Sequence, residues 1–521
     1  MKENRRVVKA AGIVGLYTLL SRILGFARDM VIAFFFGSGM ITDAFIAAFR
    51  LPNLMRRLFA EGSLVLSFVP VFTDYLETKS REDAFQLAGS ALKVLTLILV
   101  VVTVLGVIFS PLILSLLAPG FDQNPDKMAL AVSLTRIVFP YVFFVCLVAL
   151  CMGILNSLGH FSAPALAPVL LNVAMITGLL GGVYFSSDNV FRIKSLAWGV
   201  IAGGAIQLGF QVPFLVRQGF RFWKKTPLFH PGLNRIGRMM LPSVLGAGVY
   251  QVNIVAGTIL ASLLVEGSMT WLYYADRVFQ FPLGIFAISM GTAVLPSLSR
   301  QAASGDIKGL KHTFSQGLCF VFFITLPASV GLIVLSEPIV AVLFKRGEFG
   351  SHDLVMTSRA LIFYTLGLCS VSAVRVTAPV FYARQDARTP VVIAVISILI
   401  NILLSMLLMG PMQHAGLAFA TSLASTINLA LLLWAIRKQL GRLGGRVILL
   451  SVFRSLLCAL AMGAVVHGLA IYLIPAYNVP VFQMIATMVL CIGTGILVYA
   501  VLAFLTRSPE LHSVMTMLKK R

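Results

Sequence analysis

The chain alternates from end to end between long apolar runs and short polar breaks. Runs of 18 or more mostly apolar residues recur along it, and about 20 such residues in a helix cross the hydrocarbon core of a bilayer. No water reaches that depth to satisfy backbone groups, so each run is predicted to be a helix. The runs are too continuous for the alternating pattern of an outer-membrane barrel. The pattern predicts an all-α polytopic membrane protein with about 14 transmembrane helices.

The positions of the polar breaks set the extents of the predicted spans. These are 9–36, 42–75, 84–117, 128–157, 163–185, 194–216, 234–264, 269–298, 312–344, 353–382, 389–409, 415–436, 447–473 and 480–506. The first two are too long to cross straight, and Gly25 and Pro52 are their predicted bend points. Basic residues precede the first run, as in a signal peptide. No small-residue cleavage site follows, so this run is predicted to be a retained span.

Lys and Arg residues concentrate in the polar breaks on one side of the predicted membrane. Counting the N-terminus, every second break and the C-terminus, 25 of the 41 Lys and Arg residues lie on that side. The opposite breaks contain five, namely Lys127, Arg192, Lys194, Lys345 and Arg346. Because cytoplasmic loops carry the excess of Lys and Arg, both termini are predicted to be cytoplasmic, which requires an even number of spans.

The order of motifs indicates an internal repeat. Pro70 in "SFVPVF" and Pro296 in "AVLPSL" have the same separation in sequence as Pro164 and Pro390, and "FRLP" ending at Pro52 resembles a later "FQFP". This shared separation is called the repeat offset below. Six spans per half give two parallel repeats, because six is even. The predicted domains are 1–220, 221–440 and an appended pair of helices, 441–521. Glycines in span 234–264, Gly246 and Gly248 among them, indicate either a hinge or close packing against neighbouring helices.

Composition excludes several classes of protein. Hydrophobic residues make up 59% of the chain and charged residues 12%, against about 25% charged in soluble domains. The net charge of +22 is spread over short loops, so no nucleic-acid partner is predicted. Six cysteines are scattered singly through apolar runs and are interpreted as core residues, not disulfides or metal ligands. No metal motif, phosphate-binding glycine loop or ATPase motif occurs, so neither a cofactor nor an enzyme activity is expected.

Arginines inside the spans are the unusual feature of the sequence. Eleven basic residues lie in or near spans: Arg22, Arg28, Arg50, Arg56, Arg57, Lys93, Arg136, Arg277, Arg359, Arg375 and Arg454. Lys93, Arg359 and Arg454 lie near span ends, where a long side chain reaches the interface. An arginine at the bilayer centre costs about 2.5–3.5 kcal/mol even on the lenient insertion scale. The arginines well inside the spans are therefore predicted to face an internal, water-accessible cavity, namely Arg22, Arg28, Arg50, Arg56, Arg57 and Arg277.

Acidic partners inside the spans are fewer than the arginines. They are Asp29, Asp43, Glu61 and Asp276. In a continuous helix Asp43, Arg50, Arg57 and Glu61 would share one face, which leaves internal ion pairs between helices as an alternative interpretation. Because the acids cannot neutralise all the arginines, an anion site is favoured, and guanidinium groups suit phosphate oxygens especially well.

Three long blocks closely resemble the MurJ (MviN) family of lipid II flippases. They are "SRILGFARDMVIAFFFGSGMITDAFIAAFRLPNLMRRLFAEGSL" (Ser21–Leu64), "MTWLYYADRVFQFPLGIFAISMGTAVLPSLS" (Met269–Ser299) and "APVFYARQDARTP" (Ala378–Pro390). The family belongs to the multidrug/oligosaccharidyl-lipid/polysaccharide (MOP) exporter superfamily. The resemblance implies two six-helix, MATE-like lobes around a central cavity, with two extra helices forming a groove for a lipid tail.

The resemblance also implies residues and a reaction. The family's substrate-binding positions match Arg22, Arg28, Arg56 and Arg277, with Ser21 in the same motif; spacing alone favours Arg57 over Arg56. Asp43 matches the family's important acidic position and is expected to orient an arginine or take part in gating, and Asp29, Glu61 and Asp276 lie in the same motifs. The implied activity is transfer of lipid II, an undecaprenyl-pyrophosphate-linked disaccharide-pentapeptide, from the cytoplasmic to the outer leaflet of the bacterial inner membrane. The sodium site of some members is not expected, because Gln251 and Asn253 stand where an acid is needed.

The implied function predicts partners and an energy source, and it has alternatives. The partners expected are lipid II, membrane lipids and the cell-wall synthesis machinery, with transport coupled to the membrane potential or an ion gradient. Alternatives are a flippase for another polyprenyl-pyrophosphate-linked oligosaccharide or a MATE-like exporter, although a cation exporter needs an acid-rich cavity. An enzyme acting on polyprenyl pyrophosphates would need paired carboxylates or a metal site, and a scaffold would not need buried arginines.

Overall fold

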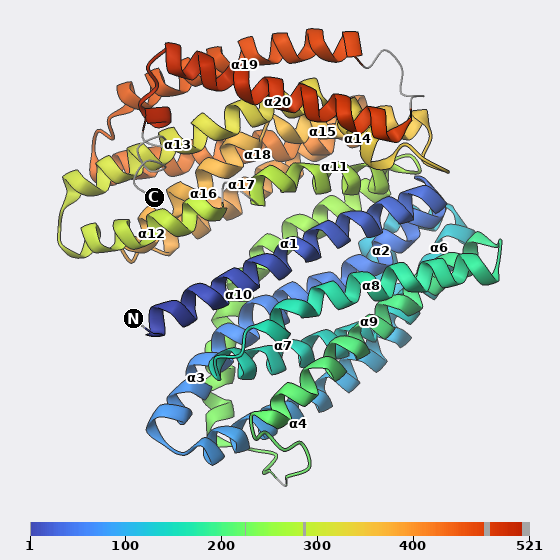
Figure 1. The fold of residues 1–521 in the computed structure, drawn as a ribbon. Coiled ribbons are helices and arrows are strands. Elements are labelled where there is room, and N and C mark those ends of the chain that lie inside the picture. Colours follow the sequence, from blue (N-terminus) through green and yellow to red (C-terminus); the bar gives the residue numbers. More distant parts are fainter. Residues whose placement is uncertain (1, 225, 285–287, 474–479, 513–521) are drawn as a thin grey trace. The chain divides into compact units, whose positions relative to one another are not determined.

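Helices account for the regular secondary structure of the described chain. The computed structural model describes residues 2–224, 226–284, 288–473 and 480–512, and no strand occurs within these ranges (Figure 1). Backbone proximity divides the chain into two compact units, unit 1 (Met1–Gly267) and unit 2 (Ser268–Arg521). The predicted all-α class is confirmed.

Unit 1 contains α1 (Lys2–Phe36), α2 (Met40–Met55), the π-helix η1 (Arg56–Ser63), α3 (Leu64–Thr78), α4 (Arg81–Ile108), α5 (Ser110–Leu117), the 3₁₀ helix η2 (Pro119–Gln123), α6 (Pro125–Val138), α7 (Tyr141–Ser157), α8 (Ser162–Phe185), α9 (Asn189–Arg217) and α10 (Pro231–Ser262). Unit 2 contains α11 (Ser268–Pro282), α12 (Ile288–Ala303), α13 (Ile307–Val334), α14 (Ser336–Phe344), α15 (Ser351–Thr365), α16 (Leu368–Ala383), α17 (Arg388–Met412), α18 (His414–Leu440), α19 (Gly445–Leu473) and α20 (Val481–Leu505).

Each predicted span coincides with one helix or with consecutive helices. Ten of the described helical segments are long and apolar enough to cross a membrane, so the chain is a multi-pass membrane protein. The predicted spans that miss this criterion are 9–36, 42–75, 234–264 and 269–298. They include α1, α2, η1 and α11, which carry most of the intramembrane charges. The helices that would be least stable in lipid are therefore those predicted to line the cavity.

The internal repeat is visible in where helices begin. Four pairs of helices begin one repeat offset apart: α4 and α13, α5 and α14, α6 and α15, and α8 and α17. The first helices of the two halves, α1 and α10, also end one repeat offset apart, at Phe36 and Ser262. The same local signals, a proline or a polar break, stop and restart the chain at equivalent points of both halves.

The repeat and the packing divide the chain at different places. By the repeat, α10 begins the second half, but it packs against η1, α3 and η2 and belongs to unit 1. The boundary predicted at residue 220 follows the repeat, whereas the packing boundary lies after Gly267. The three predicted domains describe the repeat and stay a prediction. Loop composition indicates where a repeat begins, whereas contacts between helices decide which core a helix joins.

Both units have apolar cores and apolar exteriors. In unit 1 a fully buried cluster includes Phe68, Phe72 and Leu87, whereas on α4 Leu97 and Ile108 are each 59% exposed. In unit 2 the appended helices α19 and α20 lie side by side (Figure 1) and bury Met462 and Tyr499 against α13. Large exposed apolar faces are stable only where lipid covers them.

Close packing of α8 against α9 depends on glycines. A Cβ added at Gly178 would lie 2.9 Å from Ser195 O and 3.0 Å from Gly199 Cα, whereas one added at Gly181 would meet no atom within 4 Å. Small residues let transmembrane helices approach closely, which increases van der Waals contact. The α8–α9 pair therefore tolerates side chains at Gly181 but not at Gly178.

We expect Gly178→Val to destabilise unit 1 by about 1–3 kcal/mol, because overpacking forces the two helices apart. Gly181→Val is the matched control, since it introduces the same β-branched residue into the same helix. The melting temperature of the purified protein in detergent measures both. Equal melting temperatures for the two variants would contradict the packing argument.

Candidate functional site

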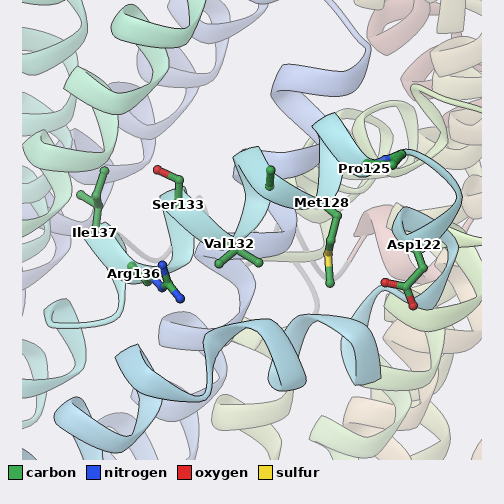
Figure 2. A pocket seen from close by; sticks show the side chains of 8 residues that line it. Asp122, Pro125, Met128, Val132, Ser133, Arg136 and Ile137 are labelled. Atoms are coloured by element: carbon green, nitrogen blue, oxygen red, sulfur yellow. The ribbon is translucent and has the colours of Figure 1, made fainter.

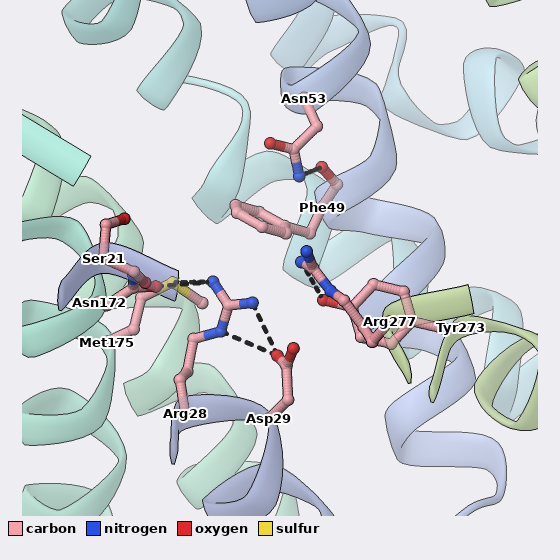
Figure 3. A network of polar contacts seen from close by, with 9 residues as sticks. All are labelled: Ser21, Arg28, Asp29, Phe49, Asn53, Asn172, Met175, Tyr273 and Arg277. Carbon is pink, nitrogen blue, oxygen red and sulfur yellow. Dashed lines mark hydrogen bonds and ion pairs between the residues drawn. The ribbon is translucent and has the colours of Figure 1, made fainter. Parts of the chain in front are cut away.

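Arg28 is the most completely buried of the predicted binding arginines. It lies in α1 with 6% of its surface exposed. Its Nε and Nη2 donate to Oδ1 of Asp29 at 3.0 and 2.7 Å, and its Nη1 donates to Oδ1 of Asn172 in α8 at 3.0 Å (Figure 3). Both charges therefore have a partner, which a buried ion pair requires.

Asn172 fixes this arrangement from the neighbouring helix. While its Oδ1 accepts from Arg28, its Nδ2 donates to the backbone oxygen of Ser21 at 3.1 Å. Met175, one turn further along α8, places its sulfur 3.7 Å from Arg28 Nη1. Sequence reasoning missed Asn172, although an uncharged amide inside an apolar span is itself a signal, because its four hydrogen-bonding sites require partners there.

Arg22 and Gly25 lie one turn apart on the same helix. Arg22 is half-buried, and within the described part of the chain no ion pair is recorded for it. The helix runs unbroken through Gly25, where an added Cβ would lie 3.8 Å from Asn172 Nδ2, an ordinary contact. The helix is thus continuous at the predicted bend point, Gly25. The role of Gly25 as a hinge stays a prediction.

The second predicted span changes helix type after Pro52. The α-helix α2 continues through Pro52 to Met55, and π-helix η1 follows. Within η1 the Ser63 hydroxyl donates to Leu58 O at 2.7 Å, a contact across five residues. The predicted alignment of Asp43, Arg50, Arg57 and Glu61 on one face is therefore wrong beyond Met55, because π geometry breaks the spacing of three and four residues that places side chains on one α-helical face.

The arginines of the second predicted span differ in their hydrogen bonds and in the type of helix that carries them. Arg50 donates from Nη1 to the Thr258 hydroxyl of α10 at 2.9 Å. Arg56 and Arg57 open η1 and are both half-buried. Glu61 also lies in η1, but its side chain falls outside the described residues. Segments of π-helix occur frequently at functional sites, and here one carries two adjacent arginines.

Asp43 is bound by a lysine that sequence reasoning assigned to a loop. Its Oδ2 accepts from Lys127 Nζ at 2.8 Å and from the Gly267 N–H at 2.9 Å. Lys127 lies in the first turn of α6 and is 7% exposed. Its interpretation as a loop residue is wrong, because α6 begins at Pro125. Asn124 followed by Pro125 is a helix-start signal that could have revealed this, and the Asn124 side chain does accept from the Lys127 N–H at 3.1 Å.

In unit 2 Arg277 and Asp276 lie on α11. Arg277 donates from Nη2 to the Tyr273 hydroxyl at 2.8 Å and lies 5.0 Å from the centre of that ring (Figure 3). Asp276 accepts from the Gln280 amide one turn later. Arg454, predicted to reach the interface, pairs with Glu510 at 2.9 Å. That carboxylate was outside the predicted spans, which is why the pair was not foreseen.

The predicted hinge glycines lie in α10. An added Cβ at Gly248 would meet no atom within 4 Å, so packing does not require glycine there. Gly246 falls outside the residues whose side-chain surroundings are described. Helix α10 is continuous through both positions, and the hinge stays a prediction.

The third motif block serves a structural purpose in the loop before α17. Asp386 accepts from the Thr389 N–H at 3.0 Å and from the Thr389 hydroxyl at 2.7 Å. These hydrogen bonds to the charged form lower the pKa of Asp386. The loop lies outside the spans, so this carboxylate fixes the start of α17 and takes no part in the candidate site.

A groove of about 640 Å³ runs along the outer face of α6 (Figure 2). Its wall is formed by Met128, Val132, Ser133 and Arg136, and Asp122 lies at one end. Arg136 donates from Nε to the Ser110 hydroxyl at 3.2 Å. None of the predicted substrate-binding arginines lines this groove, so it is separate from the candidate anion site.

Comparison with known proteins identifies the family. The family model described as "Lipid II flippase MurJ" matches residues 32–489. The probable lipid II flippase MurJ of Vibrio cholerae is 39% identical, covering 82% of each chain, and the lipid II flippase MurJ of Burkholderia cenocepacia is 35% identical, covering 81% of this chain and 82% of its own.

Solved structures show the same fold. A lipid II flippase MurJ in an inward closed conformation is 27% identical, covers 95% of this chain and 98% of its own, and has a TM-score of 0.78. An inward-facing multidrug resistance MATE family transporter, 17% identical, covers 81% of this chain and 95% of its own with a TM-score of 0.67, which shows a shared fold. With a family model that spans most of its length and relatives of this similarity, the chain belongs to the MurJ lipid II flippase family.

Proposed function

We propose that the protein transfers lipid II from the cytoplasmic to the outer leaflet of the bacterial inner membrane, with both termini in the cytoplasm. Support comes from membership of the MurJ family and from relatives whose names state this substrate. The observation that carries the proposal is that several arginines lie within the predicted spans of unit 1, one of them buried and held in place by partners from two helices. A transporter is proposed in preference to an enzyme.

An anionic headgroup is the ligand that fits these arginines. Asp29 balances the charge of Arg28, whereas Arg22 and Arg57 have no recorded ion pair within the described residues. The net charge left on α1 and η1 is positive, which stabilises an anion in a medium of low dielectric constant. A pyrophosphate presents several oxygens to planar guanidinium groups, which bind them bidentately.

In the proposed cycle the two halves move to expose the headgroup first inward and then outward, as alternating access requires. Arg22, Arg28, Arg56 and Arg277 would bind the pyrophosphate, with Ser21 and Arg57 beside them. The polyprenyl tail would stay in lipid, along a groove formed by α19 and α20. Asp43 would act in gating, with Glu61, Asp276 and Asp29 as ion-pair partners. The rivals, another lipid-linked oligosaccharide or a drug cation, are not favoured: the relatives name lipid II, and a cation requires acids.

Neutral substitutions of the binding arginines test the anion site. We expect Arg22→Gln, Arg28→Gln, Arg56→Gln and Arg277→Gln to abolish growth of cells depleted of their own lipid II flippase. Each removes a charged hydrogen bond of about 1.5–3 kcal/mol, or about 10- to 100-fold in affinity. Arg136→Gln is the matched control, because that arginine lines the separate groove. Membrane insertion is checked for every variant, and growth with all four substitutions would refute the binding site.

Removing Asn172 tests how far Arg28 must be held in place. Asn172→Leu keeps the approximate shape and deletes both hydrogen bonds, each contributing about 1 kcal/mol. We expect about a tenfold slower transfer of lipid II in proteoliposomes. Thr177→Val, on the exposed side of the same helix, should leave the rate unchanged. An unaltered rate in Asn172→Leu would show that Arg28 needs no support from α8.

The membrane potential should drive the outward step. A pyrophosphate diester carries about two negative charges, and each gains about 2.3 kcal/mol per 100 mV when it leaves a negative interior. We expect transfer to slow when an ionophore collapses the potential, with the carrier accumulating in its inward-facing state. Lipid II transfer in vesicles with potassium-clamped potentials measures this. A rate independent of the potential would contradict electrical coupling and leave an ion gradient as the driving force.

A further inference from the structure

The connection between α10 and α11 is held to the rest of unit 1 at both of its ends. This α10–α11 connection comprises residues 263–267 and joins the two compact units in the chain. Just before it, the Ser262 hydroxyl accepts from the Gly120 N–H at 3.2 Å. Within it, Glu266 Oε1 accepts from the Met40 N–H at 2.7 Å, and the Gly267 N–H donates to Asp43 at 2.9 Å. Two elements of unit 1, η2 and α2, therefore hold the connection and the helix end that precedes it.

Glycines stand at the points of closest approach, and the contact at Gly120 leaves no room for a side chain. A Cβ at Gly120 would lie 1.9 Å from the backbone oxygen of Ser262, and a Cβ at Gly39 would lie 3.2 Å from Glu266 Oε1. Gly267 has a φ of 90°, in the region that side chains disfavour. The sequence thus places glycine where the connection must lie against the backbone of unit 1.

Lys127 holds the acceptor at the end of this connection. Asp43 is 1% exposed, and one oxygen, Oδ2, accepts from both Lys127 Nζ and the Gly267 N–H. Lys127 also lies 4.4 Å from the centre of the buried Phe121 ring, within η2. A buried carboxylate is stable in its ionised form only with a cationic partner and hydrogen bonds. Removal of the lysine would leave the Asp43 carboxylate buried without that cation, which favours its displacement.

The second half of the chain provides an internal comparison. The residue one repeat offset after Lys127 is Asp353, in the first turn of α15. It accepts from the Trp271 Nε1–H of α11 at 3.1 Å. Both halves thus join the start of their fourth span to the start of their second, but the second half uses a neutral donor. What differs in unit 1 is that the carboxylate also binds the chain leaving the unit.

We propose that Lys127 is a positioning residue for transport. It acts through Asp43, which fixes the point where the chain leaves unit 1, so that the α10–α11 connection serves as a fixed pivot for movement between unit 1 and unit 2. The inference rests on the proposed function for its consequence on transport. The fixing of residues 263–267 does not depend on any substrate.

A spin label at Val265 tests the fixing directly. This side chain is 52% exposed, so a label attached to Val265→Cys disturbs no core. Spectra are recorded in nanodiscs without substrate. We expect Lys127→Met to increase label mobility clearly, while Lys194→Met, a half-buried basic residue of α9, leaves it unchanged. An immobile label in Lys127→Met, or equal mobility in both variants, would overturn the proposal.

Transport by the same variants tests the consequence. We expect Lys127→Met to slow lipid II transfer at least tenfold and Lys194→Met to change it less than twofold. If the label becomes mobile but transfer stays within twofold of the parent, the pivot is unnecessary and the proposal fails. If the parent protein transfers no lipid II at all, the proposed function fails, whereas the label comparison still decides whether Lys127 fixes the connection.

Gly267→Ala tests the same pivot at the second residue that donates to Asp43. It replaces Lys127→Met as the test variant if Lys127→Met does not fold. It leaves the buried ion pair in place and strains the backbone at the point where Gly267 binds Asp43. The expected result is again a mobile label with at least tenfold slower transfer. An immobile label, or normal transfer with a mobile label, would overturn the proposal.

Discussion

A charged side chain within a membrane span must find its partners inside the protein, and this constraint governs the arrangement of unit 1. Arg28 cannot face hydrocarbon, so Asp29 and Asn172 surround it, and α8 must lie beside α1 to bring Asn172 there. Arg50 likewise requires Thr258, which brings α10 against the second span. Helices with few charges pack mainly through small and apolar side chains, as α8 and α9 do. The polar contacts thus select neighbours, and apolar packing sets how closely those neighbours approach.

The same constraint separates two kinds of buried charge. Lys127 and Asp43 form a closed pair, with a ring on one side and a backbone donor on the other. Arg22 and Arg57 are half-buried cations with no recorded ion pair among the described residues. Closed pairs hold helices together, whereas charge that is left over can bind a ligand of opposite sign. Both kinds of charge occur in the motif Ser21–Leu64. The number of arginines exceeds the number of acids there, which indicated an anion site but did not show which acid is structural.

Much of the fold could be predicted from the sequence because apolar length and break position are local properties. The predicted spans coincide with helices, and the repeat offset first seen between prolines recurs in the starts of four helix pairs. The depth of Lys127, the helix type after Met55 and the partnership of Arg454 with Glu510 could not be predicted. Each depends on contacts between residues far apart in sequence or on a backbone choice that residue types do not encode. The contacts of Asn172 could be predicted only in part. An isolated amide in an apolar span indicates that it has a hydrogen-bonding partner, but it does not identify that partner.

Because α10 packs within unit 1, the order of synthesis determines when unit 1 can fold. Spans are released into the membrane in order during synthesis, and each lobe of the repeat could in principle fold as soon as its sixth span emerges. Unit 1 cannot do so, because η1, α3 and η2 keep an uncovered surface until the seventh span arrives. The nascent first half must therefore remain incomplete in the membrane while the basic loop of residues 217–230 is synthesised. Insertion factors that shield polar spans would be needed longest at this stage.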